Sequence, residues 1–134
     1  MKKKALLVAM LEDDSDDRYL TKETIAETGL NLDIRFHHNS DDFLADLLQN
    51  PPHLVLVDDN STPENGLQVL RRIRQAKTLS HLPVVLISDS QVPEHREDCY
   101  REGAASFIIK PRSLEATRNT ISTFFRYWLE VAEC

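Results

Sequence analysis

The chain has 134 residues, of which 41% are hydrophobic and 28% are charged, and its formal net charge at pH 7 is −6. This length and composition fit one folded domain with a sizeable core. The acidic balance argues against direct binding to nucleic acid or to a membrane surface, because both require a basic patch. We also expect no membrane-spanning segment and a cytoplasmic protein whose two cysteines are free thiols.

Short apolar runs alternate with helical patterns along the whole chain. Asp14 or Ser15, Asn39 or Ser40, and Ser113 are suited to cap helices, and Pro93 to begin one. Five strand–helix repeats with short connections predict a three-layer α/β sandwich around a parallel sheet. Periodicity alone leaves the strand order open. The predicted strands are Ala5–Leu11, Leu32–Phe36, Leu54–Asp58, Val84–Ile87 and Ser106–Ile109.

Polar residues follow four of these strands. If the sheet is parallel, they all lie along one edge, which is where open α/β sheets bind ligands. Crowded carboxylates there need a counter-charge, and a hard divalent cation such as Mg²⁺ supplies it. A metal, an ammonium, a hydroxyl and an accessible carboxylate together suit phosphoryl chemistry with an aspartate as acceptor. The residues are Glu12 and Asp13, Asp58, Ser88, and Lys110.

Four stretches, in order and at characteristic spacing, give the chain its resemblance to a known family. It resembles a response-regulator receiver domain over residues 4–130, most closely the single-domain regulators paired with phytochrome-like histidine kinases. The stretches are Glu12-Asp13, Pro52–Asp58 with Gly66 eight residues on, Leu82–Ser88, and Gly103–Pro111.

The resemblance implies a flavodoxin-like fold with strand order 2-1-3-4-5 and one receiver domain over residues 1–134 without an output domain. It implies a switch, rather than an enzyme, that is phosphorylated on Asp58 by a histidine kinase or phosphotransfer protein and only slowly dephosphorylates itself. The phosphoryl oxygens would be held by Ser88 and Lys110, and the switch residues would be Ser88 and Phe107. Mg²⁺ or Mn²⁺ would be held by Glu12, Asp13, Asp58 and the backbone carbonyl of Asn60.

Two aspartates compete for the acceptor role. Asp58 closes the apolar run, whereas counting back from Pro63 to the family's usual spacing selects Asp59. We favour Asp58, and we expect Asp59 to point away into solvent because side chains alternate along an extended segment. Asp89 stands where the family usually has a small residue, and its charge is predicted either to slow phosphorylation or alter dephosphorylation, or simply to face outward.

Two further groups of residues receive weaker predictions. The five histidines show no metal-ligand spacing on a helix and are expected to be solvated or part of the core. The last predicted helix carries more aromatic residues than one packed face requires, so it forms either core alone or also a homodimer face. The residues of that face would be Phe124, Phe125 and Trp128.

Two other functions compete with the phosphoacceptor switch. A receiver that has lost phosphorylation would act as a binding module, although the retained acidic and basic residues argue against it. A phosphohydrolase of the haloacid-dehalogenase type is suggested by the sequence from Asp58 to Thr62. That chemistry needs an acid at the third position as a proton donor, and Asn60 cannot serve.

Overall fold

The computed structural model describes residues 5–61 and 63–132. Its five parallel strands form one sheet in the order β2-β1-β3-β4-β5, which confirms the predicted flavodoxin-like fold. The elements are β1 (Leu6–Leu11), α1 (Ser15–Thr28), β2 (Leu32–His37), α2 (Ser40–Gln49), β3 (Leu54–Asp58), α3 (Gly66–Gln75), the 3-10 turn η1 (Lys77–Leu79), β4 (Val84–Ser88), α4 (Pro93–Arg101), β5 (Ser106–Ile109), α5 (Leu114–Arg126) and the π-helical segment η2 (Tyr127–Val131).

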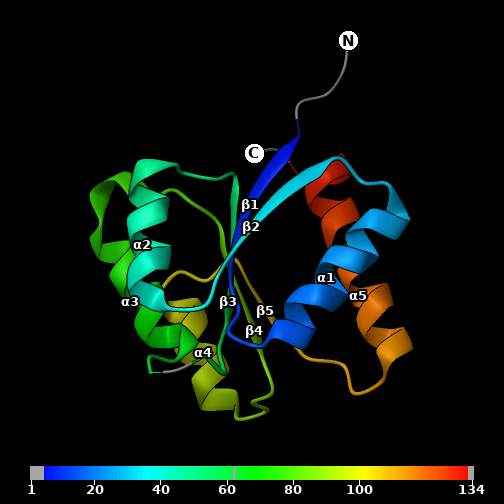
Figure 1. Ribbon diagram of the computed structural model, residues 1–134. Coiled ribbons are helices and arrows are strands. Elements are labelled where there is room, and N and C mark those ends of the chain that lie inside the picture. The colour runs from blue at the N-terminus through cyan, green and yellow to red at the C-terminus, as the bar shows by residue number, and fades with distance from the viewer. Residues whose placement is uncertain (1–4, 62, 133–134) are drawn as a thin grey trace.

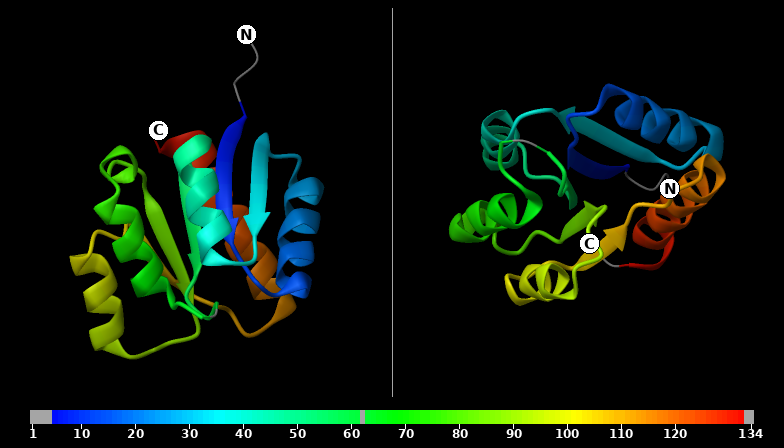
Figure 2. Two further views of the ribbon diagram at one scale, coloured as in Figure 1. Left: turned by 60° about the vertical axis from the view of Figure 1, so that its left-hand side comes forward. Right: turned by 90° about the horizontal axis from the view of Figure 1, so that it is seen from below.

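Helices cover both faces of the sheet. Figures 1 and 2 show α2, α3 and α4 on one face and α1 and α5 on the other. The central strand β3 is buried throughout, which explains its unbroken apolar sequence. Its alternate residues enter two separate cores: Val55 and Val57 pack in the α2–α3 layer, and Leu54 and Leu56 pack in the layer that contains Phe125 of α5.

The helix starts follow the predicted capping residues. Asp14, Asn39 and Ser113 each accept a hydrogen bond from a backbone N–H in the first turn of the helix that follows. The edge strand β2 is tied to α2 by Asp46, whose Oδ2 lies 2.9 Å from both Arg35 Nε and His37 Nε2. These contacts fix where the helices begin and how α2 lies against β2, on either side of the carboxyl edge of the sheet.

The C-terminal helix corrects one prediction. Phe125 is only 2% exposed and belongs to the core, so it cannot contribute to an exposed homodimer face. Phe124 and Trp128 are half-buried and pack against the same core. Because these aromatic side chains pack against the protein's own core, the large exposed side chains among the described residues at this end are Tyr127 and Val131.

Two other expectations concern thiols and membranes. Cys99 is buried and carries a free thiol, whereas Cys134 lies outside the described residues. Within the part of the chain that the structure describes, no helix has the length and apolar character needed to cross a bilayer.

Candidate functional site

The carboxyl ends of the five strands lie together at the lower edge of the sheet in Figure 1. The predicted residues that follow four of these strands therefore converge, although they are far apart in sequence. Asp58 ends β3 beside Ile87 of β4, and Lys110 follows β5 and donates its backbone N–H to the carbonyl oxygen of Ser88 at 2.9 Å. This convergence follows from the parallel topology.

Asp58 lies at the centre of the site. It is 2% exposed, and its Oδ1 is 3.0 Å from the Lys110 ammonium and accepts the Asn60 backbone N–H at 2.9 Å. Burial alone would lower the pKa of Lys110, but the hydrogen bond and the charge of Asp58 outweigh it, so the pKa is raised. The ammonium therefore stays charged and neutralises the buried carboxylate.

A second group of acids adjoins Asp58. Carboxylate oxygens of Glu12, Asp17 and Asp58 lie within 4.8 Å of one another. Burial, followed by the hydrogen bond and charge of Asp58, raises the pKa of Glu12 to about 9. Burial and the charge of Asp14 also raise the pKa of Asp17. The crowded carboxylates offer the oxygen donor set that a hard divalent cation takes, which would let Glu12 ionise.

The acids gathered here differ in part from the predicted metal ligands. Glu12 and Asp58 are both present, and Asp17, in the first turn of α1, is the third member. Asp13 is exposed and outside this group, and its role as a ligand stays a prediction, as does that of the Asn60 carbonyl. Asp17 was not among the residues predicted for the site; its place in the first turn of the helix that directly follows β1 is the signal that could have indicated it.

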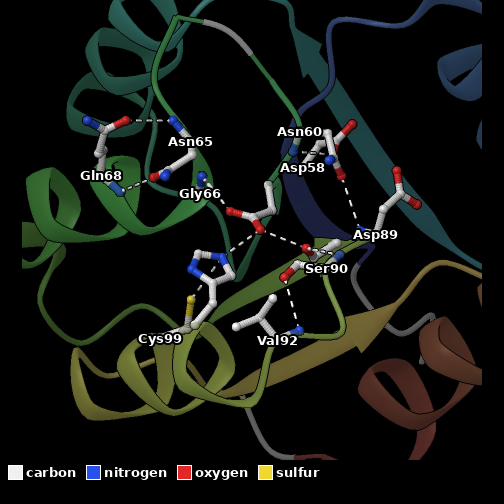
Figure 3. A network of polar contacts seen from close by, with 12 residues as sticks. Asp58, Asn60, Asn65, Gly66, Gln68, Asp89, Ser90, Val92 and Cys99 are labelled. Carbon is white, nitrogen blue, oxygen red and sulfur yellow. Dashed lines mark hydrogen bonds and ion pairs between the residues drawn. The ribbon is translucent and has the colours of Figure 1, made fainter.

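Contrary to the prediction, Asp59 does not face solvent. Its side chain points to the opposite face of β3 from Asp58, as alternation requires, but it is 9% exposed because the amino end of α3 and the helix α4 cover it. Asp59 Oδ1 accepts the Gly66 N–H at 2.9 Å, and Oδ2 accepts from Ser88 Oγ and His95 Nε2, each at 2.7 Å. Figure 3 shows this network between the labelled Gly66 and Cys99.

His95 was not predicted to contribute to the site. It lies on α4, where its Nε2 contacts Asp59 and is 3.9 Å from the Cys99 thiol one turn along. The predicted switch residue Phe107 is half-buried and packs edge-on against the His95 ring, with 6.0 Å between ring centroids. His95 thereby links the two predicted switch positions, Ser88 and Phe107, through Asp59.

The remaining predicted position is Asp89. Its side chain is exposed, and its backbone N–H donates to Asn60 Oδ1 at 3.2 Å (Figure 3). Its charge is among the causes that raise the pKa of Lys110. Asp89 thus adds negative potential at the mouth of the site, and its influence on phosphorylation stays a prediction.

Solved structures with the same fold include two response regulators. The Mn²⁺-bound form of response regulator Rcp1 superposes with a TM-score of 0.86 at 22% identity, covering 95% of this chain and 96% of that one. The phosphorylated cyanobacterial phytochrome response regulator RcpA gives a TM-score of 0.88 at 24% identity, covering 96% and 97%. At these identities the likeness concerns the fold.

Sequence comparison supplies the family. A probable methanogenesis regulatory protein, FilR2 of Methanothrix harundinacea, is 31% identical over 78 residues, which are 58% of this chain and 50% of that protein. The chain spans about half the length of the curated relatives it matches. The sequence model of the response regulator receiver domain matches residues 8–122. The chain therefore belongs to the receiver-domain family of two-component signalling.

Proposed function

We propose that this receiver domain is a phosphoacceptor switch in which Asp58 takes a phosphoryl group from a histidine kinase or phosphotransfer protein. The observation that carries the proposal is the Asp58 carboxylate, which is buried, paired with Lys110 on one side and adjoined by Glu12 and Asp17 on the other. Phosphoryl transfer to an aspartate requires an acceptor carboxylate and positive charge to stabilise the phosphoryl oxygens. Asp58 supplies the carboxylate, Lys110 supplies an ammonium beside it, and the neighbouring acids can bind a divalent cation.

The transfer would form one bond and break another. A carboxylate oxygen of Asp58 attacks phosphorus, the phosphorus–nitrogen bond of the donor phosphohistidine breaks, and the electron pair of that bond stays on the imidazole. Lys110 then stabilises the charge on the phosphoryl oxygens, and the Ser88 hydroxyl donates a hydrogen bond to one of them. Hydrolysis returns the Asp58 carboxylate when water attacks phosphorus and the oxygen–phosphorus bond breaks.

A divalent cation fits the acidic side of the site. Glu12, Asp17 and Asp58 would hold it, with Asp13 and the Asn60 carbonyl as the further predicted ligands. Mg²⁺ or Mn²⁺ would supply positive charge against the incoming phosphoryl oxygens. The closeness of the three carboxylates supports this assignment, because crowded carboxylates gain most from a cation.

The phosphorylated domain would signal through contacts with other proteins, with no direct role for nucleic acid, since the chain's net charge is −6.

Homodimerisation through the C-terminal helix is a second contact we propose. The exposed Tyr127 and Val131, next to the half-buried Trp128, support it. A constant monomer mass in light scattering up to high micromolar concentration, with and without phosphorylation, would contradict the dimer.

Intact-mass measurement after incubation with Mg²⁺ and acetyl phosphate tests the switch. We expect a labile phosphate adduct in the unmodified protein and in Asp59→Asn, and none in Asp58→Asn. An adduct that persists in Asp58→Asn would place the acceptor elsewhere. No adduct in the folded, unmodified protein would favour a domain that binds partners without phosphorylation.

A further inference from the structure

The Ser88 hydroxyl both donates and accepts a hydrogen bond in this structure. Ser88 is buried, its Oγ donates to Asp59 Oδ2 at 2.7 Å, and the Ser90 backbone N–H donates into the same Oγ at 2.9 Å. A serine hydroxyl has a single hydrogen to donate. While that hydrogen points to Asp59, it is unavailable to a phosphoryl group on Asp58.

Asp59 is a rigid acceptor. The Gly66 N–H holds Oδ1 at the start of α3, and His95 holds Oδ2 from α4. The Asp59 backbone N–H donates to the Ile87 carbonyl at 2.8 Å, which fixes the residue to β4. Contacts from three elements leave the carboxylate little freedom to follow Ser88, so the hydroxyl itself has to leave.

We propose that Asp59 is a positioning residue that holds Ser88 in its resting orientation and so sets how readily the phosphorylated state forms. The proposal rests on the proposed function, in which Ser88 donates to the phosphoryl group. The Asp59 carboxylate and a phosphoryl group on Asp58 would compete for the single hydrogen of the Ser88 hydroxyl, and the two aspartates lie on opposite faces of β3. Hydrogen bonds to charged acceptors are the stronger ones, so removing the Asp59 charge shifts this competition towards the phosphoryl group.

His95 makes the release feasible. A buried carboxylate oxygen that loses its only donor is costly, because its desolvation is no longer compensated. Asp59 Oδ2 keeps the His95 contact when Ser88 departs, so the departure costs one hydrogen bond rather than stranding the oxygen.

A comparison in two backgrounds tests the proposal. Asp59→Asn keeps the side-chain shape and an oxygen for the Gly66 N–H, but it removes the charged acceptor from Ser88. The probe is beryllofluoride, a phosphoryl mimic, with Mg²⁺, and its dissociation constant is measured by calorimetry. We expect Asp59→Asn to bind it about tenfold more tightly than the unmodified protein, the factor that corresponds to about 1.4 kcal/mol.

The same substitution in a Ser88→Ala background is the matched control. There the gain should fall below about twofold, because no hydroxyl remains to be released; a purely electrostatic or structural effect of Asp59 would persist. An equal gain in both backgrounds, or no gain in either, would overturn the proposal. Failure of the proposed function looks different: the unmodified protein would not bind beryllofluoride, or Asp58→Asn would bind it equally well.

A measurement on the unmodified protein covers the case in which Asp59→Asn does not fold. The Ser90 amide donates to Ser88 Oγ, so its NMR resonance reports whether the hydroxyl stays in place. Beryllofluoride should shift this resonance strongly. A Ser90 amide that keeps its position at saturation would show that Ser88 never leaves Asp59, and the proposal would be wrong.

Discussion

Replacing Asp59 with alanine should destabilise the fold substantially, although the residue was expected to face solvent. The substitution removes the acceptor for the buried Gly66 N–H and for Ser88 and His95. An orphaned buried donor costs about 1–3 kcal/mol. Relief from burying a carboxylate offsets part of the loss. We therefore expect a net loss of about 2–4 kcal/mol, a large share of the roughly 5–15 kcal/mol that stabilises a typical domain.

Urea unfolding followed by circular dichroism measures this loss. With a denaturant slope of about 1–3 kcal/mol/M, the midpoint should fall by roughly 1–2 M. The matched control is Asp89→Ala, whose side chain is exposed and whose backbone bond to Asn60 survives the change, so it should stay within about 0.5 kcal/mol. Equal midpoints for Asp59→Ala and Asp89→Ala would refute the account of Asp59 as a buried acceptor.

Gly66→Ala should lower the free energy of unfolding by about 1–3 kcal/mol in the same assay, because the added Cβ would sit 2.8 Å from Asp59 Oδ1 and clash with the core. In Gly29→Ala the added Cβ meets no atom within 4 Å. This substitution should lower the free energy of unfolding only by the left-handed backbone strain, about 1–2 kcal/mol, without disturbing phosphorylation. Lys110→Ala should bind Mg²⁺ more tightly in calorimetry, since the ammonium that it removes lies 3.0 Å from Asp58 and repels the cation. The same variant should accept phosphate from acetyl phosphate about tenfold more slowly, because the ammonium no longer stabilises the phosphoryl oxygens. Weaker Mg²⁺ binding by Lys110→Ala would contradict this reasoning. Burial alone would raise the pKa of Asp46, but its hydrogen bonds and the neighbouring positive charge lower it below the ordinary 3.8. Its stabilisation is therefore fully present well above the ordinary pKa and is lost as pH falls through the lowered pKa of the folded state. The unfolding free energies of the unmodified protein and Asp46→Asn, about 1 kcal/mol apart at pH 6, should therefore approach each other as the pH is lowered below the ordinary pKa; a constant gap would argue against the ion pair.

Local sequence signals were sufficient for the elements and most of their ends. The run from Leu54 to Val57 predicted a strand buried on both faces, which the structure confirms as β3. A capping residue such as Asn39 marked a helix start because its side chain satisfies free backbone N–H groups. Periodicity left the strand order open, because it describes single segments rather than their neighbours; the family resemblance supplied the order that the structure shows.

The candidate site divides in the same way. The sequence by itself determined that Glu12, Asp58, Ser88 and Lys110 follow strands and would meet if the sheet were parallel. Only the tertiary structure decided what surrounds them. Alternation correctly turned Asp59 away from Asp58, but in a sheet covered on both faces the far side is another layer of helices rather than water. A contact such as that between Asp59 and His95, on elements separated by another strand, depends on how α4 packs, and no local pattern contains that information.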